Sequence, residues 1–394
     1  MDSRSRDTLL AIEQNSKEVT YLKVGVHHLE SGCGLFESGD SDDYDKLGTA
    51  IGNNTHLTKL RIDNIYTSVR LTTANESFYD GIRNNSSITE LFLATITYDG
   101  NDITDVAFEV LGACQEKNIL TKLHINTMPL TSSAELYRCV ESLRGFTNLR
   151  EITYVHSELT DGQLLPMVEA IRGHGLIEKL DLDNNNIRDT GCEALATLRN
   201  VTKILLSENR ITNEGMISIA NSLPNNSCLR ELKIYHGSNQ IDLRVVADDF
   251  CRSLCNTSSI NDIYSSNHTF ESVISSEFIS SDASGQVKLG ALLNMNKSTR
   301  NKRHVAIKKI LLYHPHIDME PLFNLSLEEE DSSERDLKAL PHVFSWFETA
   351  KEAIIGDKKL STYDLECKKL SAIYQFVTTM PMLFVPASHG KGTK

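Results

Sequence analysis

The sequence predicts an α/β solenoid in which parallel strands alternate with helices along a single axis. Two observations predict this fold class. A strand core of the form φ-x-x-φ-x-φ, where φ is apolar, recurs along the chain, and a helical pattern with apolar residues at i, i+3, i+4 and i+7 fills the intervals. Because the two patterns keep one phase relation, each turn is a strand–helix unit that buries its apolar face against its neighbours.

Nine strand cores follow this form in order. Their spacing runs from 24 residues (Ile177 to Val201) to 38 residues (Val19 to Leu57). Polar residues alternate with the apolar ones, as expected of strands with one buried face. The weakest match, Ile260/Ile263/Ser265, is expected to be the ninth strand. The cores begin at Val19, Leu57, Ile88, Leu120, Leu149, Ile177, Val201, Leu229 and Ile260.

Five of the intervals match the helical pattern in full. In each, the last apolar residue lies six residues before the next strand core, as Ile171 lies before Ile177. Cys114, Cys139 and Cys251 occupy apolar positions of this pattern, which favours plain core packing for these thiols. The five matches span residues 107–114, 136–143, 164–171, 216–223 and 247–254.

Two motifs, "LDLDNNNI" (180–187) and "LLSENRI" (205–211), carry a family resemblance. Over roughly residues 19–270 the chain resembles the leucine-rich repeat family, in its long, ribonuclease-inhibitor-like class. The resemblance implies a horseshoe with a parallel concave sheet and outer helices. It also implies that Asn185 and Asn209 turn inward after their strands and hydrogen-bond backbone that would otherwise be buried unpaired. Other units carry different residues at this position, so the asparagine ladder is predicted to be broken: they are Ile65, Ile96, Met128 and Ser157.

A solenoid exposes its core at both ends and needs caps. We expect an N-terminal cap over residues 1–18, a solenoid of about nine units over 19–287, and a helical C-terminal cap or tail over 288–394. The stretch "RHVAIKKILLYH" (303–314) fits either a tenth strand or a helix. The segments "SSNHTF", "LPHVFSWF" and "IYQFVTTMPMLF" are similar to parts of uncharacterised repeat proteins from diatoms.

Composition excludes several classes of function. A net charge of −13 argues against nucleic-acid binding, which needs clustered Lys and Arg. No apolar run reaches the roughly 18 residues of a membrane span, and the N-terminal residues lack the apolar core of a secretory signal. The eight cysteines contain no Cys-x-x-Cys pair, which favours reduced thiols over a metal site. We therefore expect a cytoplasmic monomer with no cofactor and no bound metal.

No motif predicts catalysis. The chain has no phosphate-binding Gly-x-x-x-x-Gly-Lys-Ser/Thr loop, no Gly-x-Ser-x-Gly elbow and no His-Glu-x-x-His pair. The histidines are scattered along the chain. We expect no catalytic residues, and so a protein that is not an enzyme.

Strand alternation places positions 3, 5 and 7 of each unit on the concave face. Position 3 alternates in charge along much of the chain, as in Lys59, Glu90, Lys122 and Glu151, so one interpretation is a solvated face whose charges pair with each other. The other is a binding surface, because aromatic and aliphatic groups lie among the charges. On that interpretation Tyr235 and Tyr264 sit on adjacent strands as one aromatic anchor. The predicted partner-binding residues are Phe92, His124, Asp181, Leu205, Lys233, Tyr235 and Tyr264.

The expected function is non-catalytic protein–protein recognition or scaffolding through the concave face. An alternative is a GTPase-activating regulator, since Ran-type activators are similar horseshoes with a long acidic tail. Here the acidic run "LSLEEEDSSERD" (325–336) is short and is followed by residues of helical character. A third possibility, the sensor repeats of a nucleotide-switch receptor, lacks the phosphate-binding module of that class.

Overall fold

The computed structural model describes residues 1, 3–25, 34–38, 40–63, 71, 75–94, 104–235, 238–274, 284–313, 354–355 and 358–359. The chain divides into two compact units. The first comprises Met1–Phe250 and Phe270–Val287, and the second comprises Cys251–Thr269 and Lys288–Lys394.

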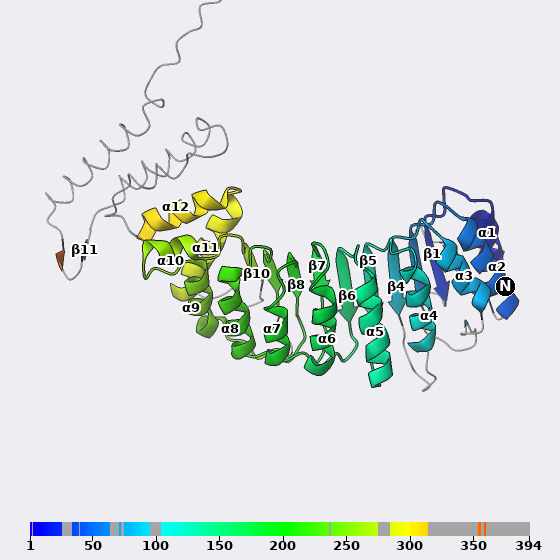
Figure 1. Cartoon of the computed structure of the whole chain (residues 1–394), viewed down its shortest axis with the longest axis horizontal. Helices are drawn as coiled ribbons and strands as arrows, with labels where there is room; N and C mark the ends of the chain where they lie inside the picture. Colours follow the sequence, from blue (N-terminus) through cyan, green and yellow to red (C-terminus); the bar gives the residue numbers. More distant parts are fainter. Residues whose placement is uncertain are drawn as a thin grey trace, which may run out of the picture. The chain divides into compact units, whose positions relative to one another are not determined.

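The first unit is built on one sheet of ten strands, and all of its neighbouring strands run parallel (Figure 1). The spatial order is β10-β9-β8-β7-β6-β5-β4-β3-β1-β2, so chain order is kept except at the β1–β2 edge. The strands are β1 (Tyr21–Gly25), β2 (Gly34–Phe36), β3 (Lys59–Asp63), β4 (Glu90–Ala94), β5 (Lys122–Asn126), β6 (Glu151–Val155), β7 (Lys179–Asp181), β8 (Lys203–Leu205), β9 (Glu231–Lys233) and β10 (Ser272–Ile274).

An α-helix follows each strand from β3 to β8, and consecutive helices pack against each other along one face of the sheet (Figure 1). The helices of the first unit are α1 (Ser3–Glu13), α2 (Ser41–Asn53), α3 (Glu76–Asn84), α4 (Thr104–Gln115), α5 (Ser133–Gly145), α6 (Asp161–Ile171), α7 (Asp189–Leu195), α8 (Asn213–Ser222) and the short 3-10 turn η1 (Leu223–Asn225). Helix α9 (Leu243–Leu254) begins in the first unit, as does α11 (Ser284–Ser298).

The core is a column of leucine and isoleucine side chains, one from the second residue of each strand from β3 to β9. The strand register pairs them directly across the sheet, and none is more than 3% exposed. Burying one such side chain stabilises a fold by about 1.5–3 kcal/mol. The column consists of Leu60, Leu91, Leu123, Ile152, Leu180, Ile204 and Leu232.

Helices α2 and α3 approach each other through glycines. A Cβ atom at Gly81 would overlap the Gly48 carbonyl oxygen, and a Cβ atom at Gly48 would overlap the backbone of Ser77 and Phe78. Because backbone on both sides is in contact, neither position has room for a side chain.

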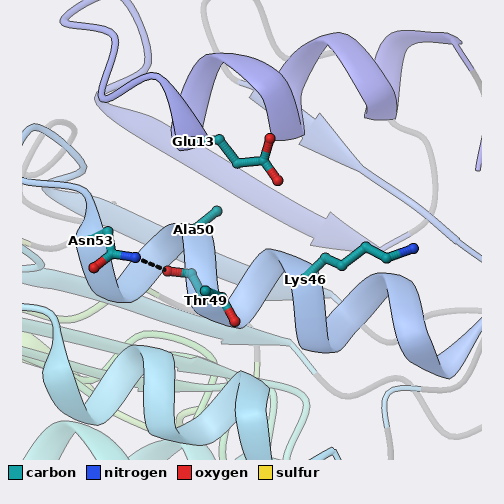
Figure 2. A pocket seen from close by; sticks show the side chains of 5 residues that line it. All are labelled: Glu13, Lys46, Thr49, Ala50 and Asn53. Atoms are coloured by element: carbon teal, nitrogen blue, oxygen red, sulfur yellow. Dashed lines mark hydrogen bonds between the residues drawn. The ribbon is translucent and has the colours of Figure 1, made fainter.

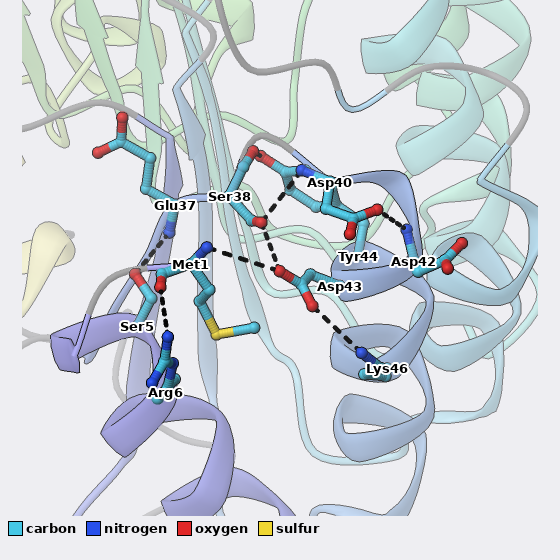
Figure 3. A network of polar contacts seen from close by, with 10 residues as sticks. All are labelled: Met1, Ser5, Arg6, Glu37, Ser38, Asp40, Asp42, Asp43, Tyr44 and Lys46. Carbon is cyan, nitrogen blue, oxygen red and sulfur yellow. Dashed lines mark hydrogen bonds and ion pairs between the residues drawn. The ribbon is translucent and has the colours of Figure 1, made fainter.

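A polar network joins α1, β2 and α2 at one edge of the sheet (Figure 3). Ser5 Oγ accepts from the Glu37 amide (3.0 Å), and Ser38 Oγ donates to Asp43 (2.6 Å). The Tyr44 hydroxyl donates to the Ser38 carbonyl (3.2 Å). The Ser38 hydrogen bond lowers the pKa of Asp43, and burial raises the pKa of Tyr44 to about 12. The network therefore joins the end of β2, a strand that the repeat pattern did not predict, to helices α1 and α2.

The ninth predicted strand is wrong. Residues 260–265 form helix α10 (Ile260–Ser265), because the Ser259 side chain caps its N-terminus by accepting from the Asp262 amide. The strand that follows β9 is β10. The apolar spacing comes from two buried residues, Phe270 just before β10 and Val273 within it.

In the second unit, residues 302–313 form helix α12 (Lys302–Tyr313), which decides between the two expectations for this stretch in favour of a helix. Its Lys309 is fully buried. The Lys309 ammonium donates to the carbonyls of Leu254 (2.6 Å) and Asn267 (3.0 Å) and lies 3.2 Å from His268 Nδ1. Burial lowers the pKa of Lys309 to about 7 and that of His268 to about 4. A two-stranded antiparallel piece, β11 (Ile354–Ile355) and β12 (Lys358–Lys359), completes the elements.

Several expectations lie outside the described residues. They include the acidic run 325–336, the segments "LPHVFSWF" and "IYQFVTTMPMLF", and positions Ile65 and Ile96. Among the helices that the structure describes, none is long and apolar enough to cross a membrane.

Candidate partner-binding face

One face of the sheet carries the polar residues of the strands. In β3 to β6 the first and third residues are half-buried and the second and fourth are buried. Strand alternation places the second set on the opposite face of the sheet from the first. Figure 1 shows the helices along one face of the sheet, and the buried set belongs to that face. We call the surface formed by the first and third residues of β1 and β3–β9, together with Tyr235, the open face.

Ion pairs run along the first residues of these strands. Lys122 Nζ lies 3.5 Å from Glu90 and 3.0 Å from Glu151, its register neighbours on both sides. Farther along the sheet, Lys203 of β8 pairs with Glu231 of β9 (2.6 Å). The hydrogen bond to Glu151 is the largest cause of the raised pKa of Lys122. These side chains are about a third exposed, so each pair contributes at most about 1 kcal/mol.

An aromatic stack crosses the same face over β1 to β6. Lys59 Nζ lies 4.3 Å from the ring centroids of both Tyr21 and Phe92. On its other side Phe92 stacks on His124, with ring centroids 4.0 Å apart, and His124 Nδ1 is 3.0 Å from Thr153 Oγ1. Burial lowers the pKa of His124 to about 4, so this imidazole is neutral at pH 7. Phe92 and His124 thus contact each other, and both faces of Phe92 are occupied.

The expectation that Leu205 and Asp181 are accessible on this face is wrong. Leu205 is 6% exposed and Asp181 is 8% exposed. Leu205 lies in register between Asp181 and Lys233, which flank it on both sides. Asp181 pairs with Lys179 (2.8 Å) and accepts from the Asp183 amide (3.2 Å).

Tyr235 remains accessible. Its side chain is 39% exposed, and Lys233 Nζ lies 4.7 Å from its ring centroid. The Tyr235 amide donates to Ser207 Oγ (3.3 Å), which fixes the backbone as it leaves β9. Of the aromatic side chains that the structure describes on the open face, Tyr235 is the most exposed.

The predicted anchor of Tyr235 and Tyr264 on adjacent strands is wrong. Tyr264 lies on helix α10 and is 48% exposed there. Asp262 lies on the same helix, where its carboxylate accepts from the hydroxyl of the capping residue Ser259. Neither Tyr264 nor Asp262 belongs to the sheet. The strand interpretation failed because the local helix-capping signal is stronger than the weak apolar spacing.

A buried ion cluster lies at the β1–β3 end of the sheet. Lys23 Nζ is 3.0 Å from Asp63, and Arg61 Nε is 2.8 Å and 2.9 Å from the two Asp63 oxygens. Lys23 is 1% exposed and Asp63 is 2% exposed, although sequence alternation predicted that both would be open. The Asp63 carboxylate thus lies between the Lys23 ammonium and the Arg61 guanidinium.

Turn asparagines satisfy buried backbone where the chain leaves the sheet. Asn185 Oδ1 accepts from the Leu159 amide (3.0 Å), while its Nδ2 donates to the Tyr154 carbonyl (2.7 Å). One unit later, Asn209 Oδ1 accepts from the Ile187 amide (3.1 Å). Both side chains are buried, so each bridges two successive units.

This ladder is longer than the sequence predicted. Ser157, which was expected to break it, accepts from the Met128 amide through its hydroxyl (3.0 Å). At the other end Asn239 Oδ1 accepts from the Ile211 amide (2.9 Å). A serine hydroxyl can replace the amide because one acceptor is enough to satisfy the neighbouring turn.

A second asparagine ladder, which the sequence analysis missed, precedes the strands. In it each Oδ1 accepts from the backbone amide of a strand core's first apolar residue. The signal was an asparagine three residues before that apolar residue. The pairs are Asn54 with Leu57 (2.8 Å), Asn85 with Ile88 (2.9 Å) and Asn226 with Leu229 (3.0 Å).

Elsewhere in the described part of the chain we find no constellation suited to catalysis. No group of three His, Cys, Asp or Glu residues there is placed to hold a metal ion. Burial raises the pKa of Cys114 and Cys139 to about 12, which keeps these thiols protonated. Figure 2 shows a small hollow lined by Glu13, Lys46, Thr49, Ala50 and Asn53 of α1 and α2. The hydrogen bond drawn between two of these lining residues, from Asn53 Nδ2 to the Thr49 carbonyl, is internal to α2.

Comparison with known sequences finds repeats in the middle of the chain. A family model described as "Leucine Rich repeat" matches residues 176–196 and 197–220. The human "NACHT, LRR and PYD domains-containing protein 5" is 28% identical over 112 residues, which are 27% of this chain and 9% of that protein. The chain thus matches less than a tenth of the length of this relative.

Three solved structures are similar over part of their length. The leiomodin-1 actin-binding site 2 is 19% identical with a TM-score of 0.35, covering 43% of this chain and 92% of that one. The tropomodulin C-terminal domain of Caenorhabditis elegans is 8% identical with a TM-score of 0.31 and the same coverage. An internalin of Listeria monocytogenes is 15% identical with a TM-score of 0.32, covering 63% and 86%. Scores this low support no statement about function.

Three features coincide in the first unit: one sheet of parallel strands, helices between successive strands, and buried asparagines in the strand-exit turns. The matched repeats lie in the same part of the chain, over β7, α7, β8 and α8. The chain therefore carries leucine-rich repeats on an α/β solenoid fold.

Proposed function

We propose that this chain is a non-catalytic recognition module that binds a protein partner through the open face, with Tyr235 as its anchor. Solenoids of this kind present an extended surface on the strand side, and protein–protein interaction is the general role of leucine-rich repeats. The open face is the side of this sheet on which polar side chains remain half-exposed.

The exposure of Tyr235 carries the proposal. Interface energy concentrates in a few aromatic and arginine side chains, and Tyr is among the most enriched. Phe92 and His124 are occupied by their mutual stack, whereas Tyr235 keeps 39% of its surface free. Lys233 beside it adds a charged group that can pair with the partner.

Further expectations accompany this proposal. The helices between β3 and β9 support assigning the repeats to the long, ribonuclease-inhibitor-like class. The module is proposed to act as a cytoplasmic monomer without cofactor or nucleic acid. No feature of the described residues favours the GTPase-activating alternative.

The test is affinity capture from native lysate with four baits: wild type, Tyr235→Ala, Tyr264→Ala and Tyr137→Ala. Tyr137 lies on α5 and is 67% exposed, so it is a matched substitution away from the sheet. We expect Tyr235→Ala to lose proteins that the other three baits retain, since truncating an anchor costs about 2 kcal/mol or more.

Circular dichroism establishes that each bait is folded. Because Tyr235 is surface-exposed, its removal should change stability little. If folded Tyr235→Ala captures every protein that wild type captures, recognition does not use the open face. If Tyr137→Ala loses these proteins and Tyr235→Ala retains them, the binding surface lies on the helices and not on the open face.

A further inference from the structure

A polar cluster in the second unit joins helix α12 to the end of α9 and to the residues that follow α10. Its centre is the buried ammonium of Lys309, whose three neighbours are the Leu254 carbonyl, the Asn267 carbonyl and His268 Nδ1. An ammonium has three N–H donors, so it can donate one to each of these groups. The Leu254 carbonyl lies at the C-terminus of α9, where the helix dipole favours a cation. The cluster is therefore complete when Lys309 is charged.

The hydrogen bonds of His268 decide which of its ring nitrogens carries the hydrogen. Nε2 lies 3.2 Å from the Tyr264 carbonyl, which only accepts, so Nε2 donates. Nδ1 lies 3.2 Å from the Lys309 ammonium, which only donates, so Nδ1 keeps its lone pair and accepts. The imidazole is therefore neutral when both contacts are made.

An additional proton on this imidazole would break the cluster. It would place an N–H of a cationic ring against the Lys309 ammonium, so that two positive charges and two donors would face each other. Lys302, in the first turn of α12, is a further cation that acts on both groups. Cys255 also acts on Lys309, but burial raises the pKa of its thiol, so it carries no charge at acidic pH. Burial and then the charge of Lys309 are the largest causes of the low pKa of His268, about 4.

We propose that the contact between His268 and Lys309 is an acid-sensitive switch that holds helix α12 in place at neutral pH. When the imidazole takes up a proton, the contact breaks and α12 loosens from α10 and from the end of α9. Side chains of α12 that are buried at neutral pH then become accessible, among them Val305 and Ile310. His268 is itself only partly buried, so protons can reach its ring from solvent.

The direction of the pH dependence follows from the two states of the ring. The pKa of His268 is about 4 with α12 in place and returns to the ordinary 6.5 when the contact is lost. The open form therefore binds more protons between these values, so α12 is held less firmly as pH falls from 6.5 towards 4. Between pH 7 and pH 5 the open fraction should rise roughly twentyfold. Lys309 changes its protonation mainly above this range, since its pKa is lowered to about 7.

The experiment is hydrogen–deuterium exchange of the full-length protein at pH 7 and pH 5, corrected for intrinsic exchange rates and followed by mass spectrometry. Wild type should lose roughly twentyfold protection over residues 302–313. His268→Gln keeps an acceptor for Lys309 and a donor for the Tyr264 carbonyl but does not titrate, so its α12 should stay protected at both pH values. His156→Gln, which removes an exposed histidine from the turn after β6, should behave as wild type.

Equal protection of α12 at pH 7 and pH 5 in wild type would overturn the inference. An equal loss in wild type and His268→Gln would also overturn it, because another titrating group would then cause the loss. If His268→Gln does not fold, an NMR titration of the His268 ring in wild type decides. A midpoint at least one pH unit below the ordinary 6.5 would support the switch, and any higher midpoint would refute it. None of these outcomes involves Tyr235, so the proposed function is tested separately.

Discussion

The early units (β1–β4) and the regular units (β6–β9) are held together by different contacts. In the regular units, each turn repeats one device: a buried asparagine or its equivalent accepts from the backbone of the preceding unit. The helix starts interlock in the same manner, since Asp189 accepts from the amides of Thr212 (2.8 Å) and Gly215 (3.0 Å). The early units use the asparagines that precede their strands, Asn54 and Asn85, and add single contacts such as the Gly48–Gly81 approach and the buried cluster around Asp63.

The exit-turn asparagines satisfy the same backbone groups in successive regular units, although the strand cores of these units begin 24 or 28 residues apart. The Gly48–Gly81 approach and the cluster around Asp63 each occur once and satisfy no repeated backbone group.

The largest expected effect is at the buried cluster of the early units. Asp63→Asn removes the carboxylate between Lys23 and Arg61 and leaves a buried, uncompensated cation, which should cost about 3–5 kcal/mol. Asp80→Asn on α3, whose carboxylate is 59% exposed, is the matched control and should change stability by less than about 0.5 kcal/mol. Urea denaturation measures both. Similar midpoints for the two variants would show that the cluster does not hold the early units.

The close approach of α2 and α3 should give the next largest effect. Gly81→Ala forces backbone apart at Gly48 and should destabilise by about 3 kcal/mol. Gly112→Ala on α4 has nothing within 4 Å of the new methyl group, so it should stabilise by about 0.5–1 kcal/mol. Thermal unfolding of the pair gives the sign of each change. A stable Gly81→Ala protein would mean that the helices are not in backbone contact.

In the regular units, Asn209→Ala should cost about 1–3 kcal/mol because the Ile187 amide and the Leu182 carbonyl lose their partner in a buried turn. Asn186→Ala should cost well under about 1 kcal/mol, since the side-chain hydrogen bond of Asn186, to the Glu158 carbonyl at 3.4 Å, is exposed. Denaturant titration compares the two. Equal losses would contradict the inward and outward roles of these neighbours.

The smallest effect concerns the pH dependence of stability at β5, the strand next to the early units. The folded-state pKa of His124 is lowered to about 4, below its ordinary 6.5, so the unfolded chain binds more protons between these values. Stability should therefore fall as pH decreases from 6.5 towards 4. His124→Phe keeps the stack on Phe92 and removes this contribution. Because carboxylates also titrate there, the informative quantity is the difference between wild type and variant, and a difference that does not change with pH would refute this assignment.

The sequence predicted most strands of the sheet because apolar periodicity repeats wherever a unit buries one face. It missed β2, a three-residue strand in a Gly-, Ser- and Asp-rich stretch, because nothing in that stretch repeats. It misplaced the last strand because α10 is inserted before it and brings its own apolar residues. Strand β10 follows, with Val273 buried within it and Phe270 buried two residues before its start.

The candidate site was predictable as a face and much less so as a set of residues. Alternation places Phe92, His124 and Leu205 on the open face, but their accessibility depends on neighbours from other strands. Phe92 is occupied by Lys59 and His124, contacts that depend on rotamers and on distances across the sheet. The sequence alone therefore does not show that Tyr235 is more accessible than Phe92, His124 and Leu205, whereas the structure does.

The most direct test of the recognition surface is photo-crosslinking in native lysate. A photoreactive phenylalanine analogue would replace Tyr235 in one protein and Tyr137 in another, and adducts would be identified by mass spectrometry. If the open face binds the partner, the probe at position 235 forms a specific protein adduct that the probe at position 137 on α5 does not form. The same adduct from position 137 alone, or from both positions equally, would contradict recognition through the open face.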